Sequence, residues 1–226
     1  MTTILEAVKG RLIVSCQALP DEPLHGAPIM ARMALAAEQG GAAAIRANGA
    51  DDVRSIKEQT GLPVIGIVKK VYPGSSVYIT PTLQEVEELI DAGADMIAMD
   101  STLRKRPGGC TAEELIRFMH SRGVPAMADV STLEEAQQAE RLGADCISTT
   151  LSGYTPYSVS RIGPDFELVE QAAERLGIPV LAEGRVSEPS QVTALLRLGA
   201  HAVVVGSAIT RPQLIAERFA AAAGRR

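Results

Sequence analysis

Short apolar runs alternate with longer amphipathic segments along nearly the whole chain. Two phrases introduce these runs: Gly-x-Pro at Gly61, Gly123 and Gly177, and Gly-Ala at four other positions. The Gly-Ala phrases begin at Gly41, Gly93, Gly143 and Gly199. Glycine suits the end of a helix, and proline stops the helix and is tolerated at the first residue of a strand. Each following apolar run therefore predicts a parallel strand that is buried on both faces.

The segments between the runs carry helix start signals. Three of them begin with Thr-x-x-Glu, at residues 82–85, 111–114 and 132–135. In this capping box the hydroxyl and the carboxylate each accept a hydrogen bond from a backbone N–H group of the first helical turn. Apolar residues at helical spacing follow each box, so these segments predict amphipathic helices.

With the run Arg11–Cys16, the pattern comprises eight strands that alternate with about eight helices. Eight βα units without a break in composition predict a single-domain (β/α)8 TIM barrel over residues 1–226. An open, doubly wound sheet is the alternative arrangement of the same units.

Composition narrows the class of protein. Hydrophobic residues make up 46% and aromatic residues 3%, so we expect an aliphatic core. The net charge of −5 offers no broad basic face, which argues against a nucleic-acid partner. No run approaches 18 apolar residues and no signal peptide is recognisable, so we expect a cytoplasmic protein without a membrane partner. Three cysteines without CxxC spacing and three unclustered histidines predict neither a disulfide framework nor a metal site.

Polar or charged residues stand at the end of nearly every predicted strand. In chain order they are Gln17, Arg46, Lys69, Asp100, Asp129, Thr149, Thr150, Glu183, Gly206 and Ser207. The active sites of such barrels form at the carboxyl ends of the strands. The sequence therefore predicts a polar pocket that caps an apolar barrel.

The last two units carry a further signal. Gly184 follows the seventh strand, and Gly206 and Ser207 follow the eighth. Loops seven and eight are the usual phosphate cradle of this fold, because glycines let backbone N–H groups approach the oxygens. Arg211 lies close enough in sequence to add charge-assisted hydrogen bonds. We expect a phosphate-binding barrel.

Simpler interpretations exist for the charged residues. Lys69 could instead be a solvent-exposed lysine, like the adjacent Lys70. Glu183 could instead be one half of a structural ion pair. Asp129 could instead cap its own loop or orient neighbouring side chains.

Seven motifs together resemble the N-acetylmannosamine-6-phosphate 2-epimerase family of sialic acid catabolism. They are IVSCQALPDEPLH, IRAN, IGIVKK, VYITPT, TTLSGYT, AEGR and VVVGSAITRP. The resemblance extends from about Gly10 to Phe219. It implies a carbohydrate-phosphate isomerase that interconverts N-acetylmannosamine 6-phosphate and N-acetylglucosamine 6-phosphate without a cofactor. A small sugar phosphate is then the expected partner.

The resemblance also implies roles for individual residues. Lys69 corresponds to the catalytic lysine of the family, Glu183 to its partner, and Arg211 to the phosphate-binding arginine. Substrate contacts are implied for Gln17, Arg46 and Asp129. From its place at a strand end, Thr150 is a further expected substrate contact, and Gly184, Gly206 and Ser207 complete the expected phosphate site.

Epimerisation at C2 requires a base for a proton next to a carbonyl group. A lysine with its ordinary pKa of about 10.4 is protonated at neutral pH, and a nearby carboxylate raises its pKa further. We therefore expect Glu183 to face Lys69, to position it and to exchange a proton with it. The alternatives are an aldolase-like enzyme in which Lys69 forms a Schiff base, and a barrel that binds a sugar phosphate without catalysis.

The C-terminal segment carries Leu214, Ile215 and Phe219 at helical spacing. These apolar residues and the fold class lead us to expect a homodimer.

Overall fold

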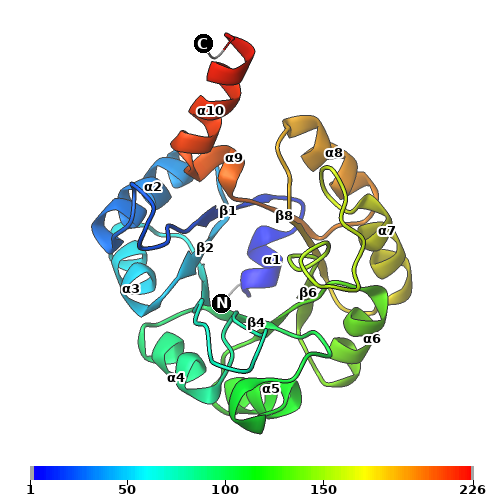
Figure 1. Cartoon of the computed structure of the whole chain (residues 1–226). Helices are drawn as coiled ribbons and strands as arrows, with labels where there is room; N and C mark the ends of the chain where they lie inside the picture. The colour runs from blue at the N-terminus through cyan, green and yellow to red at the C-terminus, as the bar shows by residue number, and fades with distance from the viewer. Residues whose placement is uncertain (1–2, 225–226) are drawn as a thin grey trace.

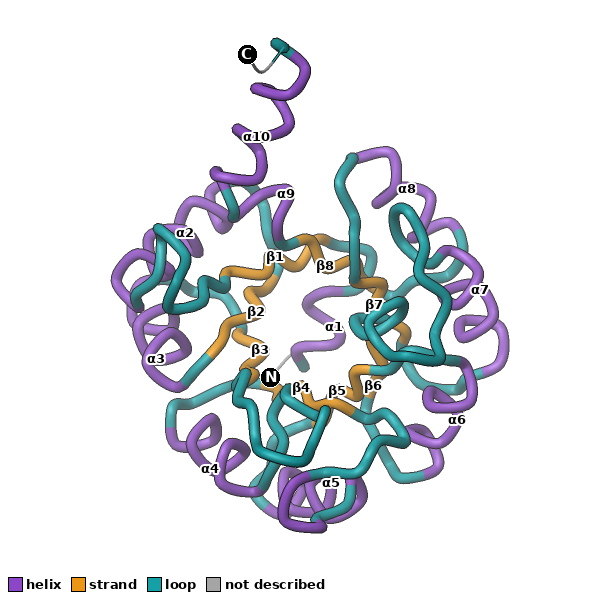
Figure 2. The backbone as a smooth tube through the Cα atoms, viewed as in Figure 1, coloured by secondary structure: helices purple, strands orange, loops and turns teal. Residues whose placement is uncertain are grey.

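The computed structural model describes residues 3–224 and shows a closed barrel of eight parallel strands. The strands are β1 (Leu12–Cys16), β2 (Ala44–Asn48), β3 (Val64–Ile67), β4 (Met96–Asp100), β5 (Ala126–Asp129), β6 (Cys146–Ser148), β7 (Val180–Glu183) and β8 (Ala202–Val205). Each strand pairs with the next one in the chain, and β8 returns to pair with β1, as the orange ring in Figure 2 shows. The predicted (β/α)8 barrel is confirmed, and the open sheet is excluded.

Helices lie outside this ring, except for the amino-terminal helix, which lies at its centre in Figure 1. Within residues 3–224 they are α1 (Ile4–Val8), α2 (Ala27–Gln39), α3 (Ala50–Gln59), α4 (Leu83–Asp91), α5 (Ala112–Ser121), α6 (Leu133–Arg141), α7 (Phe166–Arg175), α8 (Pro189–Arg197), α9 (Ser207–Thr210) and α10 (Pro212–Ala222), with a 3₁₀ turn η1 (Pro107–Gly109). No helix in this part of the chain has both the length and the apolar composition to cross a bilayer. Helix α10 extends away from the ring, and none of its side chains is buried.

Two of the three predicted capping boxes are formed. The hydroxyl groups of Thr82 and Thr111 each accept a hydrogen bond from the first helical turn, and the carboxylate of the glutamate three residues later accepts one from the threonine's backbone N–H group. The third prediction is half wrong. Thr132 caps α6, but the carboxylate of Glu135 accepts hydrogen bonds from the backbone N–H and the hydroxyl group of Ser131, both at 2.7 Å. The buried glutamate thereby fastens the loop that precedes the helix.

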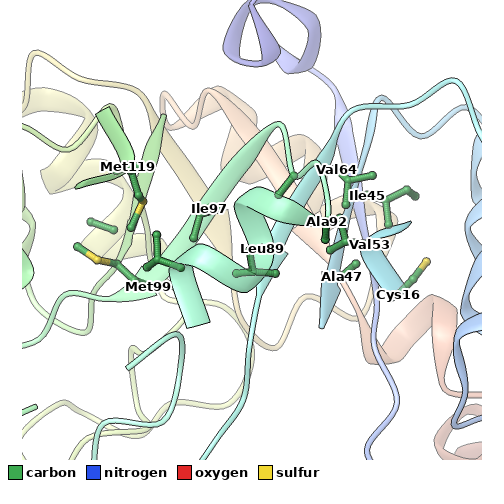
Figure 3. Packing of buried hydrophobic residues seen from close by; sticks show 14 of the residues in the cluster. Cys16, Ile45, Ala47, Val53, Val64, Leu89, Ala92, Ile97, Met99 and Met119 are labelled. Atoms are coloured by element: carbon green, nitrogen blue, oxygen red, sulfur yellow. The ribbon is translucent and has the colours of Figure 1, made fainter. Parts of the chain in front are cut away.

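The hydrophobic core has two layers. The outer layer lies between the strands and the helices, where Val53, Leu89 and Met119 pack toward the barrel (Figure 3). The inner layer fills the barrel itself with Ile13, Ala44, Ile65, Met96, Met127, Leu181 and others. Helix α1 plugs the amino-terminal end of this layer with Ile4 and Val8. The apolar filling leaves the opposite end of the barrel for polar side chains.

Side chains alternate between the two layers along each strand, as the strand period of two requires. In β2, Ile45 and Ala47 belong to the outer layer, and Ala44 belongs to the inner layer. Arg46 therefore points into the barrel. It lies within β2, two residues before its end at Asn48, and not at the strand end as the sequence suggested. The same alternation turns Lys69, Asp129 and Glu183 inward.

Candidate functional site

A cavity of about 440 Å³ opens at the carboxyl ends of the strands. Nine of the ten residues expected at the site line it. They are Gln17, Arg46, Lys69, Thr150, Glu183, Gly184, Gly206, Ser207 and Arg211. The tenth, Asp129, has no exposed surface and lies behind Arg46.

Lys69 follows β3 directly, and its backbone is fixed on both sides. Its N–H group donates to the side-chain oxygen of Asn48 at 2.8 Å, and it forms an antiparallel bridge with Ile79. Its amine makes no ion pair or hydrogen bond with any of residues 3–224. The chain therefore presents an unpaired amine on a rigid backbone.

The surroundings of this amine shift its ionisation toward the neutral form. Burial lowers the pKa of Lys69, and the positive charges of Arg46 and Arg211 lower it further. The carboxylates of Glu183 and Glu22 oppose this effect but do not reverse it. A lysine with a lowered pKa is a better base at neutral pH than an ordinary one.

Arg46 forms a buried ion cluster with two carboxylates. Its guanidinium forms ion pairs with Asp129 on one side and Glu183 on the other, and one of its nitrogens also donates to Thr150 at 3.1 Å. The Arg46 side chain is only 1% exposed, and Asp129 is 0% exposed. Such complete desolvation makes the mutual attraction of these charges strong and removal of any one of them costly.

The ionisation states follow from this geometry. Burial disfavours the charged form of Arg46, but the charges of Asp129 and Glu183 outweigh burial and raise its pKa. Burial raises the pKa of Asp129 to about 6, although Arg46 opposes the shift. Both groups are therefore mainly charged at neutral pH.

The partner of Glu183 differs from the one that the sequence suggested. Its oxygen Oε2 pairs with Arg46 and also accepts hydrogen bonds from Thr150 at 3.0 Å and Ser148 at 3.3 Å. The expected direct contact with Lys69 is absent. Arg46 points inward from β2 and occupies the carboxylate oxygen Oε2 of Glu183, so Lys69 is left unpaired. The second oxygen, Oε1, has no partner among residues 3–224 and remains available at the cavity.

The other end of the cavity has the features expected of a phosphate cradle. Gly184 has φ = 110°, a conformation that side chains rarely adopt. A Cβ atom on Gly206 would lie 3.3 Å from Cβ of Ser15, so glycine allows α9 to approach β1 closely. Ser207 begins α9, and the Nη1 atom of Arg211 lies 3.5 Å from its hydroxyl oxygen.

Gln17 has an incomplete set of hydrogen bonds. Its amide nitrogen donates to the hydroxyl group of Ser15 at 2.7 Å. Its amide oxygen is buried and has no partner within the described residues. A buried polar atom without a partner costs free energy unless a ligand satisfies it.

The family assignment follows from comparison with known proteins. Residues 30–225 match the family model NanE, described as "Putative N-acetylmannosamine-6-phosphate epimerase". The chain belongs to this family. A relative from Clostridium perfringens, named "Putative N-acetylmannosamine-6-phosphate 2-epimerase", is 57% identical over 216 residues, which cover 96% of this chain and 98% of the relative. A relative of the same name from Clostridioides difficile is 56% identical, with 96% and 97% covered.

A solved structure supports the assignment. It is titled as the N-acetylmannosamine-6-phosphate 2-epimerase from Clostridium perfringens and superposes on this chain with a TM-score of 0.96. The two chains are 56% identical, and the alignment covers 97% of this chain and 96% of the other. The barrel described above is therefore that of a NanE epimerase.

The sequence did not predict several residues in or beside the cavity of this NanE chain, among them Glu22, Ser148 and Tyr78. Glu22 holds Arg211 through two contacts of 2.9 Å, Ser148 bonds to Glu183, and Tyr78 lines the cavity. Glu22 and Tyr78 lie in loops, whose course the strand pattern does not predict. Ser148 could have been predicted, because it lies two residues after Cys146 in β6 and therefore on the same inward face of the strand.

Proposed function

We propose that this chain interconverts N-acetylmannosamine 6-phosphate and N-acetylglucosamine 6-phosphate by removing and returning the proton at C2. The observation that carries the proposal is the unpaired amine of Lys69, whose pKa is lowered, in the cavity of a NanE barrel. Simple binding of a sugar phosphate has no need of such an amine, since a charged lysine would bind the anion more strongly.

The proposed step takes place on the open-chain sugar. Lys69 Nζ accepts the proton from C2 as that C–H bond breaks. The electron pair forms a C1–C2 double bond, and the electrons of the C1 carbonyl move onto its oxygen to give an enolate. After the enolate has turned in the cavity, Lys69 returns the proton to the opposite face of C2 and the C1 carbonyl re-forms, which leaves the amine neutral and completes epimerisation.

The buried ion cluster supports this step in two ways. Arg46 places a fixed positive charge at the cavity wall, which lowers the pKa of Lys69 and stabilises negative charge that develops on the substrate. Asp129 holds the guanidinium in place, and Thr150 links it to Glu183. The free Oε1 of Glu183 is suited to take the proton from Lys69 or from a sugar hydroxyl group.

The remaining lining residues are suited to hold the ends of the substrate. Gln17 can use its unpaired amide oxygen to accept a hydrogen bond from the sugar. Backbone groups at Gly184, Gly206 and Ser207 can bind the phosphate. The guanidinium of Arg211 can also bind the phosphate. It can keep its ion pair with Glu22 while it does so, or the phosphate can replace Glu22 as its partner.

The direct test is proton NMR of the purified chain with N-acetylmannosamine 6-phosphate. We expect signals of N-acetylglucosamine 6-phosphate to appear until the two sugars reach equilibrium, without any added cofactor. A substrate spectrum that stays unchanged with folded protein would contradict the proposal.

A second candidate draws on the same amine. An unpaired lysine with a lowered pKa is also what Schiff-base formation requires. Treatment with substrate and borohydride distinguishes the two functions by mass spectrometry. The epimerase gains no covalent adduct, and an aldolase-like enzyme gains the mass of the reduced sugar on Lys69.

We also propose that the chain forms a homodimer in the cytoplasm, with a second copy against α10. Leu214 is 39% exposed and Phe219 is 75% exposed on this projecting helix. Sedimentation equilibrium should give twice the mass of the chain, and Phe219→Glu should shift the equilibrium toward the monomer. A wild-type monomer at micromolar concentration would contradict this.

A further inference from the structure

The segment between β3 and α4 folds back over the cavity as a short hairpin. Lys69 pairs with Ile79 in an antiparallel bridge, and the N–H group of Lys70 donates to the carbonyl oxygen of Tyr78 at 2.9 Å. Tyr78 is therefore held next to the residue pair that contains the proposed base. Both Lys69 and Tyr78 line the cavity.

The far side of the hairpin is anchored to the barrel. Thr80 has φ = 43°, which a residue with a branched side chain adopts only where its surroundings hold it. Its hydroxyl group donates to the carbonyl oxygen of Ala98 in β4 at 2.7 Å. Its backbone N–H group donates to the carbonyl oxygen of Val68, also at 2.7 Å. The position of Tyr78 two residues earlier is consequently well determined.

The phenol group of Tyr78 has no partner in the described part of the chain, residues 3–224. Two other tyrosines show the contrast, since the hydroxyl groups of Tyr72 and Tyr157 each donate to a buried glutamate at 2.6 Å. Tyr78 is half-buried at the cavity, whereas the amide oxygen of Gln17 is fully buried. A phenol in such a position is free to bond to a ligand.

The surroundings of Tyr78 keep its proton in place. Burial raises its pKa, and the carboxylates of Asp129 and Asp100 raise it further, against a smaller opposing effect of Arg104. The group is therefore a hydrogen-bond donor at neutral pH, suited to an oxygen that becomes negatively charged.

The barrel places this donor across from the expected phosphate cradle. Gly184 follows β7 and Gly206 follows β8, whereas Tyr78 follows β3 on the other side of the closed ring (Figure 2). A six-carbon chain whose phosphate is held at β7 and β8 must direct its C1–C2 end toward the β3 side. That end carries the reacting carbonyl group.

We infer that the phenol of Tyr78 donates a hydrogen bond to the C1 oxygen of the substrate and stabilises the enolate that forms when Lys69 takes the C2 proton. The inference rests on the proposed epimerase function and adds a catalytic residue to it. No proton leaves Tyr78: the C2 proton resides on Lys69, the charge resides on the C1 oxygen, and both are reversed when C2 is protonated again.

The test is Tyr78→Phe, which keeps the ring and removes only the hydroxyl group. Loss of one donor to a developing oxyanion typically lowers kcat about 10²–10³-fold, and we expect this fall with little change in KM. Tyr72→Phe is the matched control, because its hydroxyl group lies in the same loop, is bonded to Glu85 and does not line the cavity. Its kcat should stay within about threefold of wild type.

A second measurement remains decisive even if Tyr78→Phe does not fold. Replacement of Tyr78 by difluorotyrosine lowers the phenol pKa, so the fall of kcat at high pH should begin at lower pH. A high-pH limb that does not move, or a folded Tyr78→Phe variant with kcat within twofold of wild type, would overturn the inference and leave the epimerase function intact. A wild-type chain that converts no substrate would instead refute the proposed function itself.

Discussion

Replacement of Arg46 by Met tests the account of the buried ion cluster most severely. The substitution keeps an unbranched side chain of similar length and removes the cation that lies between Asp129 and Glu183. Two carboxylates then face each other, one of them with no exposed surface and the other 13% exposed. Breaking a buried ion pair from one side costs about 3–5 kcal/mol.

That cost is large for a chain of this size. The free energy of unfolding of a domain is about 5–15 kcal/mol, and each 1 kcal/mol changes Tm by about 2–4 °C for 150–250 residues. We therefore expect Arg46→Met to lower Tm by about 6–20 °C in circular-dichroism melts at pH 8. Arg54→Met is the matched control, because Arg54 pairs with Asp51 where the two side chains are 50% and 87% exposed. This surface pair should contribute less than about 1 kcal/mol.

The pH dependence of the same variant gives a second check. Without the guanidinium, the pKa of Asp129 rises above the value of about 6 that it has beside Arg46. A carboxyl group whose pKa is raised in the folded state binds protons more tightly than in the unfolded state, so stability falls as pH rises through that pKa. The deficit should therefore be smaller at pH 5 than at pH 8. A deficit equal to that of Arg54→Met, or one independent of pH, would refute the cluster as described.

Three further predictions concern activity and packing. Because the pKa of Lys69 is lowered, kcat/KM should rise with pH along a limb centred below pH 10.5, and a limb centred at pH 10.5 would be contrary evidence. Lys69→Arg should abolish activity. Arg211→Ala should raise KM about 10-fold or more and largely spare kcat, whereas an unchanged KM would remove Arg211 from phosphate binding. Gly66→Val should cost about 1–3 kcal/mol in urea unfolding, since its Cβ would lie 2.9 Å from Leu89 Cδ2; unchanged stability would contradict this packing.

Much of the fold could be predicted from the sequence because its signals are local. Glycine and proline mark where each helix ends and each strand begins. Because the βα unit repeats, its interpretation at one place in the chain applies to the other units as well. The carboxyl ends of parallel strands must meet at one end of a barrel, so the cavity follows from topology alone. Placing nine of ten expected residues around it required no knowledge of side-chain conformation.

Contacts between those side chains could not be predicted in the same way. Whether Glu183 pairs with Arg46 or Lys69 depends on the register of β2 against its neighbours and on the reach of a long guanidinium. Glu135 illustrates the same limit, because the residue before the helix competes with the cap for its carboxylate. Tyr78 lies in a returning loop, and only the folded hairpin brings it beside Lys69.

The central claim is that the amine of Lys69 accepts the C2 proton. Its most direct test is the rate at which C2 of N-acetylmannosamine 6-phosphate gains deuterium in D₂O, followed by proton NMR with wild-type protein and with Lys69→Ala. We predict that the substitution lowers this exchange about 10²–10⁴-fold, while circular dichroism shows an intact fold. Exchange at the wild-type rate in the folded variant would contradict the account.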